Sequence, residues 1–360
     1  MKIHERLSVL VVLNRSWSGF IQVPSSQVHF AVVLLTFVDD SAYKGSKILP
    51  QEMVLAVLIM PAVLGAQLAT VRQPVRLHTI NVGSRALTTE PAIVVLHGLL
   101  GSGSNFATWA KALANSCDAE GKPRRVLLAD LRNHGESAHR NEMDFNDMAS
   151  DVVHMLNEEG IDRAVLFGHS IGGKVAMATA LLHRERVERL CVIDIAPTTY
   201  EESEEQWASV VSVVSAMRSV NLGICATKKD VDLQLARSVS DPSLRAFVLT
   251  NLLRTPTLAG GNIFSWRVNL ASIESSLSVL AGWKVESADG SPYSGNTLFI
   301  AGGKSRFLRS SHLPAIQTSF ERFSLSTIRS AAHWVHADEP EALLVIASNF
   351  LAAPAPSSEN

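Results

Sequence analysis

Ser170 lies in the segment Gly168–Gly172 (GHSIG), a G-x-S-x-G pattern whose spacing is typical of a nucleophilic serine. A short apolar run precedes the pattern and a helical pattern follows it, so we predict a tight strand-to-helix turn. Such a turn exposes Oγ at a helix N-terminus, whose dipole favours developing negative charge. The backbone N–H of Ile171 would then serve as an oxyanion donor.

A second oxyanion donor is predicted from residues 97–102 (HGLLGS), which follow the apolar run 92–96. The glycines allow a sharp turn that directs backbone N–H groups into a cleft, and the N–H of Leu99 is the predicted donor. The pattern is short, so an ordinary glycine-rich turn is the alternative interpretation.

The candidate general base lies in residues 331–340 (AAHWVHADEP), just before an apolar helical pattern that starts at about Glu341. In the serine-first chain order of catalytic triads, the histidine comes last, on the loop before the final helix. His333 and His336 both fit this position. We favour His333 because it comes first out of the strand and precedes Trp334, which could pack beneath it.

The acid of the triad is missing from its usual place, because residues 301–309 (AGGKSRFLR) contain no Asp or Glu. Asp289 and Glu321 are the nearest acids, and neither fits. Asp194 ends the apolar run 190–193, on a strand that should neighbour the nucleophile strand. A carboxylate in such an apolar setting needs a partner, and the Nδ1–H of the base could supply one. The alternative is an aspartate that caps a local turn.

These residues need a scaffold, and short apolar runs bounded by turn residues predict one. Runs rich in branched residues suit buried parallel strands, and helical patterns lie between them. The predicted strands are 92–96, 125–129, 164–167, 190–193 and 297–300, and the predicted helices are 106–115, 145–159 and 172–182. This alternation predicts the α/β class, a mostly parallel sheet with helices on both faces and a ligand site at the carboxyl ends of the strands.

The polar segment 130–137 (DLRNHGES) follows the second predicted strand. We interpret it as structural, with Asp130 paired to Arg132, Gly135 at positive φ, and His134 a loop residue rather than the base. Residues 198 to about 285 form a long insertion with helical patterns at 206–217 and 244–253. An insertion at this place is expected to cap the site and to supply apolar pocket walls.

Composition narrows the class of protein. The chain has 360 residues, 47% of them hydrophobic, and a net charge of −2, so nothing indicates a nucleic-acid partner. Its three cysteines are far apart, and no His/Cys spacing suits a metal. We therefore expect neither a disulfide framework nor a cofactor or metal. Oligomeric state is not indicated by the sequence.

Residues 1–73 differ from the rest and are predicted to be an N-terminal extension to the domain at 74–352. The apolar run 53–69 carries no charge and sits near the lower limit for a membrane span, about 17 residues. A membrane anchor, a buried helix, a cleaved targeting segment and a mispredicted start all remain open. The basic residues near the start suit an organellar presequence. The Pro/Ser-rich tail 353–360 is predicted to be disordered.

Taken together, these motifs resemble one branch of the α/β-hydrolase superfamily, the α/β-hydrolase domain-containing protein 11 family of animals with its bacterial esterase relatives. The resemblance covers roughly residues 75–352. The matching blocks are 97–102 (HGLLGS), 105–106 (NF), 130–137 (DLRNHGES), 168–177 (GHSIGGKVAM), 187–197 (VERLCVIDIAP), 266–270 (WRVNL), 298–305 (LFIAGGKS) and 333–337 (HWVHA).

The resemblance implies an α/β-hydrolase fold with a helical cap and a Ser-His-Asp hydrolase of small acyl esters, lipid esters or acyl thioesters, including acyl-CoA. It also supports Asp194 as the acid. Animal members of the family are mitochondrial, so the resemblance strengthens the interpretation of the basic N-terminus as a mitochondrial presequence. Two positions depart from the family pattern. Ala271 stands where some members are assigned an acid, and Ala332 replaces a glycine before the base. The alternative function is a non-catalytic binding protein on the same fold, which a lost triad residue would indicate.

Overall fold

The computed structural model describes residues 8–13, 17–22, 73–83, 90–116, 123–257, 262–287 and 289–353. The chain divides into two compact units, Met1–Val71 and Arg72–Asn360. In the first unit, β1 (Ser8–Leu13) pairs antiparallel with β2 (Trp17–Gln22). The run 53–69 and residues 354–360 lie outside the described residues, so the anchor, targeting and tail hypotheses stay predictions. Within the described part, no helix is long and apolar enough to cross a membrane.

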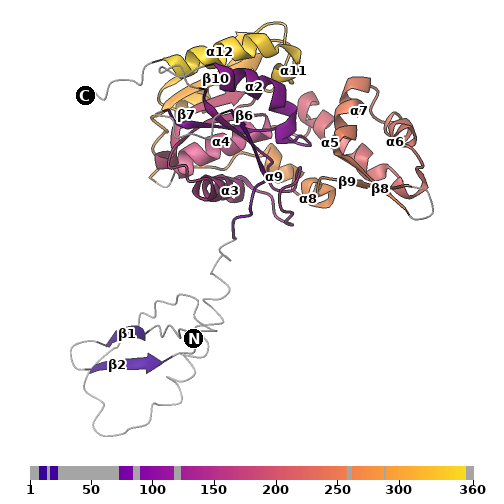
Figure 1. The fold of residues 1–360 in the computed structure, drawn as a ribbon. Coiled ribbons are helices and arrows are strands. Elements are labelled where there is room, and N and C mark those ends of the chain that lie inside the picture. Colours follow the sequence, from indigo (N-terminus) through magenta and orange to yellow (C-terminus); the bar gives the residue numbers. More distant parts are fainter. Residues whose placement is uncertain are drawn as a thin grey trace. The chain divides into compact units, whose positions relative to one another are not determined.

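A seven-stranded sheet forms the centre of the second unit (Figure 1). In spatial order its strands are β11 (Phe323–Ile328), β10 (Asn296–Gly302), β7 (Val187–Ile193), β6 (Ala164–His169), β4 (Ala92–Leu96), β5 (Arg125–Ala129) and β3 (Thr79–Gly83). β3 pairs antiparallel with β5, and the other neighbouring pairs in this sheet are parallel. The central strands are buried along their whole length, as in β4 and β6, which explains their continuous apolar runs.

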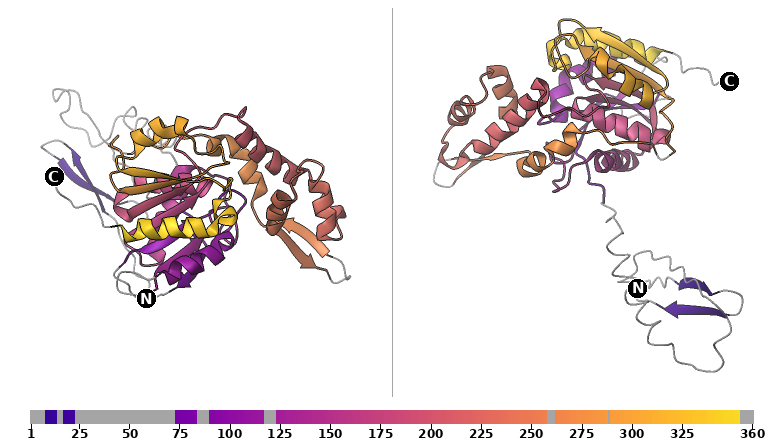
Figure 2. Two further views of the ribbon diagram at one scale, coloured as in Figure 1. Left: turned by 90° about the horizontal axis from the view of Figure 1, so that it is seen from above. Right: turned by 180° about the vertical axis from the view of Figure 1, so that it is seen from behind.

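Helices cover both faces of this sheet (Figure 2). The helices of one face are α2 (Ala107–Asn115), α11 (Val335–Asp338) and α12 (Pro340–Ala352). The helices of the other are α3 (Phe145–Glu158), α4 (Ile171–Leu182) and α10 (Leu313–Ser319). Alternate residues of the strands pack into two separate apolar cores, one per face. The predicted class, a mostly parallel sheet between two helical layers, is confirmed.

Two strands of the sheet were not predicted. β3 has only one buried residue, Val82, and β11 has only Ile328, because both strands lie at the edges of the sheet. An edge strand presents much of its surface to solvent, so it lacks the long apolar run that marks a central strand.

The segment between β7 and β10 contains helices and a hairpin that extend outward from the side of the sheet where the strands end (Figure 1). Its helices are α5 (Glu205–Ser219), α6 (Lys228–Leu235), α7 (Pro242–Val248), α8 (Leu270–Ser275) and α9 (Leu277–Ala281). β8 (Leu252–Pro256) and β9 (Asn262–Trp266) pair antiparallel. The helix predicted over 244–253 was partly wrong, because the chain turns into β8 at Leu252. We call residues 198–285 the cap.

Candidate active site

Ser170 occupies the turn between β6 and α4, with φ 53° and ψ −124°. This backbone conformation is costly for a residue with a side chain, and the packing around the turn maintains it. A Cβ on Gly168 would collide with the carbonyl of Gly172, and a Cβ on Gly172 would collide with the carbonyl of Leu96. The spacing of the pattern therefore follows from two close approaches, one between β6 and the start of α4 and one between α4 and the end of β4.

The structure brings Ser170, His333 and Asp194 together in one chain of hydrogen bonds. His333 Nε2 lies 3.0 Å from Ser170 Oγ, and its Nδ1 lies 2.7 Å from Asp194 Oδ2. The second carboxylate oxygen, Oδ1, accepts the N–H of Gly302 at 2.9 Å. With both carboxylate oxygens engaged, the hydrogen of His333 belongs on Nδ1, which leaves Nε2 free to accept a proton from Oγ.

Asp194 reaches this position because β7 lies between β6 and β10. Its side chain is fully buried, its φ is 52°, and its backbone N–H donates to Ile300 of the neighbouring strand at 2.8 Å. The buried carboxylate is stabilised by the imidazole and by one backbone N–H. The strand that ends in Asp194, β7, therefore lies beside the nucleophile strand β6, as the sequence predicted.

The loop that carries Leu99 approaches the nucleophile closely. A Cβ on Gly98 would lie 2.9 Å from His169 Nδ1 and 3.2 Å from the Ser170 Cβ, so a glycine favours this close approach. Leu99 lines the pocket above Ser170, while Ile171 opens α4 directly after it. Both predicted oxyanion donors therefore belong to segments that adjoin the serine.

Two buried histidines hold this loop. The Nδ1–H of His97 donates to the Gly98 carbonyl at 2.7 Å, and its Nε2 accepts the N–H of Leu131 at 3.0 Å. His134 accepts the N–H of Leu100 at 3.1 Å and donates from Nδ1 to a backbone carbonyl. Burial lowers the pKa of His97 and, with the nearby His97, lowers that of His134 to about 3. Both rings are therefore neutral at pH 7, as these bonds require.

Asp130 and Arg132 do not pair with each other, so that part of the loop prediction was wrong. Arg132 donates to both oxygens of Asp151 at 2.6 and 2.8 Å and to Asp147 at 3.1 Å. Asp130 instead accepts the backbone N–H groups of Gly103 and Glu136 and contacts His78. The prediction of a positive φ was right, since Gly135 has φ 53°.

The surroundings of the base also differ from expectation. The Phe307 ring packs against His333 at a centroid distance of 4.2 Å, whereas Trp334 lies at 6.0 Å. His169 donates from Nε2 to the His333 carbonyl at 2.8 Å and so helps to fix the backbone of the base. His336 stacks on Phe106 at 4.0 Å, and burial together with His333 lowers its pKa to about 4.

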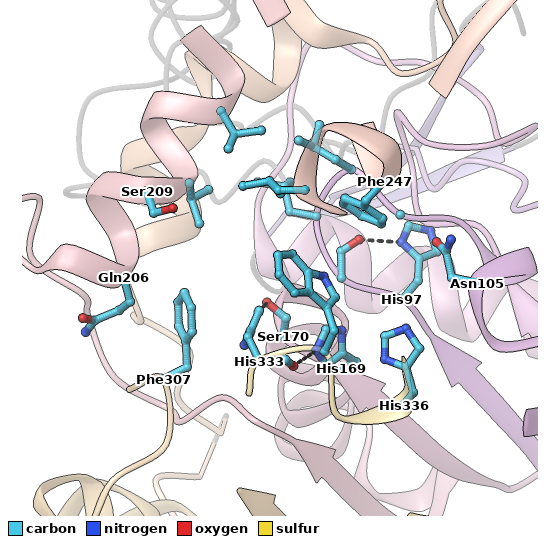
Figure 3. Close-up of a pocket in the computed structure, with 18 of the residues that line it drawn as sticks. His97, Asn105, His169, Ser170, Gln206, Ser209, Phe247, Phe307, His333 and His336 are labelled. Atoms are coloured by element: carbon cyan, nitrogen blue, oxygen red, sulfur yellow. Dashed lines mark hydrogen bonds between the residues drawn. The ribbon is translucent and has the colours of Figure 1, made fainter. Parts of the chain in front are cut away.

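An apolar pocket of about 240 Å³ opens above Ser170 (Figure 3). Figure 3 places Ser170 between Phe307 on one side and His97 and His336 on the other. The apolar lining comes from the cap and from the loops after the strands, and consists of Leu99, Leu100, Phe106, Val210, Val213, Leu244, Phe247, Phe307 and Trp334. Gln206 and Ser209 bring polar groups from α5. Among the described residues, no cluster of His, Cys, Asp or Glu could hold a metal ion.

Comparisons with known proteins agree with this fold. The family model described as the alpha/beta hydrolase fold matches residues 91–222. The mouse sn-1-specific diacylglycerol lipase ABHD11 is 36% identical over 73% of this chain and 82% of its own length. The esterase YbfF of Escherichia coli is 28% identical over 72% of this chain and 92% of its own. The solved structure of a marine microorganism esterase, 28% identical, covers 77% of this chain and 99% of its own with a TM-score of 0.69.

The fold and the arrangement of the site define the α/β-hydrolase class. Within that class, the 36% identity to mouse ABHD11 over 82% of that protein's length indicates one particular group. The chain therefore belongs to the α/β-hydrolase family, in the group of ABHD11 and its bacterial esterase relatives.

Proposed function

We propose that this protein is a carboxylic ester hydrolase that acts through an acyl-enzyme on Ser170. His333 is the general base and Asp194 the acid, and the backbone N–H groups of Leu99 and Ile171 form the oxyanion hole. The observation that carries the proposal is the unbroken hydrogen-bonded chain from Asp194 through His333 to the serine Oγ at the floor of an apolar pocket.

In the first half-reaction, Ser170 Oγ attacks the ester carbonyl carbon while His333 Nε2 takes the hydroxyl proton. The carbonyl oxygen becomes an oxyanion, which the two backbone N–H groups stabilise. His333 then returns its proton to the leaving alkoxide or thiolate, the bond to it breaks, and the alcohol or thiol departs. Water repeats the sequence on the acyl-enzyme and releases a carboxylic acid.

The proposed substrate is an ester or thioester with an apolar acyl group. The pocket wall is mainly aliphatic and aromatic, and burial of a hydrocarbon chain there contributes about 0.8 kcal/mol per methylene group. The relatives named as a diacylglycerol lipase and as esterases support an ester carbonyl as the reacting group.

The test compares wild type with Ser170→Ala in hydrolysis of p-nitrophenyl butyrate and in labelling by a fluorophosphonate. We expect turnover and labelling to disappear in Ser170→Ala while its circular dichroism and Tm stay those of a folded protein. Ser278→Ala, at an exposed position of α9, is the matched control and should retain both. A folded wild type that neither labels nor hydrolyses any ester would leave the non-catalytic binding protein as the better reading.

A further inference from the structure

Lys174 is the one buried lysine within the described residues, and the reaction above does not use it. It lies one turn after the nucleophile in α4, and its backbone N–H donates to the Ser170 carbonyl at 3.1 Å. Its side chain is completely buried. Lys174 therefore links the helix that presents the nucleophile to whatever its side chain binds.

Three carbonyl acceptors surround the Lys174 amino group, one for each hydrogen of its charged form, while burial lowers its pKa to about 7. Nζ donates to Leu280, Ala281 and Gly282 at 3.2, 2.9 and 2.9 Å. These carbonyls lie at the C-terminus of α9, where helix carbonyls lack partners and a positive charge is favoured. The charge also lies 4.9 Å from the centre of the Tyr200 ring. The Lys174 side chain thus satisfies the carbonyls at the C-terminal end of α9, a helix in another part of the fold.

The carbonyls that Lys174 binds belong to the point where the cap joins the sheet domain. Here the outgoing chain, residues 199–200, and the returning chain, residues 280–283, are hydrogen-bonded to each other. The N–H of Tyr200 donates to Ala281 at 3.0 Å, and the N–H of Trp283 donates to Thr199 Oγ1 at 3.1 Å. We call these two segments the neck. Lys174 attaches the neck to the nucleophile helix.

The neck in turn contacts one part of the pocket wall and leads directly into another. The Tyr200 hydroxyl donates to the backbone carbonyl of Phe307, whose ring lines the pocket and packs against His333. Five residues beyond Tyr200, α5 begins, and it supplies Val210 and Val213 to the pocket lining. The position of the neck therefore determines how far these walls stand from Ser170.

We propose that Lys174 is a positioning residue, which holds the cap neck against the nucleophile helix and so sets the shape of the acyl pocket. Burial of an ammonium group is unfavourable, and a methionine would fill a similar space without a charge. The three directed bonds to the neck account for a lysine at this position. The inference rests on the proposed function, because it concerns the pocket in which that reaction takes place.

The experiment uses Lys174→Met in the full chain, with Lys284→Met as the matched control at an exposed position just beyond the neck. Each protein is assayed with p-nitrophenyl acetate, whose short acyl group makes little contact with the pocket walls from the cap, and with p-nitrophenyl octanoate, whose long acyl chain packs against them. We expect kcat/KM for octanoate to fall about tenfold in Lys174→Met through a higher KM, and that for acetate to fall less than about threefold. Lys284→Met should match wild type on both esters.

Equal losses on both esters would overturn the inference, because they would show a general loss of folded enzyme. Unchanged kinetics on both would overturn it as well. If Lys174→Met does not fold, Thr199→Val, which removes one bond within the neck, should give the same selective loss, and equal effects on the two esters would refute the idea. If the proposed hydrolase function itself were wrong, the wild type would show neither turnover nor labelling of Ser170, so that outcome can be told apart from a failure of the role proposed for Lys174.

Discussion

Replacement of Asp194 by asparagine tests the least usual part of the proposed triad. Asparagine keeps the shape of the side chain but turns one acceptor oxygen into a donor. If the amide oxygen faces His333, the amide nitrogen faces the Gly302 N–H, and two donors meet where the bond is now 2.9 Å. If the amide is reversed, its nitrogen faces His333 Nδ1, which must then accept. The imidazole hydrogen moves to Nε2, where it points at Ser170 and cannot receive a proton.

Either orientation removes the working tautomer or leaves a buried donor unpaired. In serine proteases the corresponding change lowers kcat about 10⁴-fold, which is about 5 kcal/mol of barrier. We expect a decrease of about 10³- to 10⁴-fold in Asp194→Asn, with KM changed little because the substituted group does not line the pocket.

The assay is steady-state hydrolysis of p-nitrophenyl acetate at pH 8, with the folded fraction measured by circular dichroism. Asp289→Asn is the matched control, since Asp289 is exposed, pairs with Arg184, and lies near the usual place of the acid in the sequence. It should retain wild-type activity. A folded Asp194→Asn protein with kcat within tenfold of wild type would refute the assignment.

Two further predictions concern the other histidines. His336→Phe should keep kcat within about tenfold, because the ring is neutral and stacks on Phe106, whereas His333→Ala should lose about 10³-fold or more. Equal losses in steady-state assays would mean that the base is misassigned. Burial lowers the pKa of His134 to about 3, so the unfolded chain binds more protons than the folded one between that value and about 6.5. The free energy of unfolding should therefore fall by about 2 kcal/mol between pH 7 and pH 5 on account of this residue. Urea unfolding at both pH values should show a smaller change in His134→Asn, and an identical change would contradict the prediction.

Features that depend on neighbours along the chain could be predicted from the sequence. The central strands carry continuous apolar runs because both of their faces are buried, and the G-x-S-x-G pattern specifies its own turn. The position of Asp194 also followed, since a strand that comes after the nucleophile's helix pairs beside the nucleophile strand. The absence of an acid after β10 directed attention to that neighbour.

Contacts between segments far apart in the sequence could not be predicted in this way. Arg132 binds Asp151, nineteen residues further along on α3, rather than Asp130 two residues before it. Phe307 rather than Trp334 packs against the base, because the loop after β10 folds back over the site. The partners of Lys174 could not be predicted either, because they are backbone carbonyls and therefore independent of residue type.

The neck has a consequence for how such proteins can diversify. The cap leaves the domain and returns to it at one point, since Tyr200 and Ala281 are hydrogen-bonded to each other. Asp194 precedes that point in the chain and His333 follows it, so none of the three residues of the proposed triad belongs to the cap. The segment between them can therefore vary in length and sequence without the loss of any residue of the proposed triad. Substitutions in the cap can therefore change which substrates enter the pocket while the residues of the proposed triad stay the same.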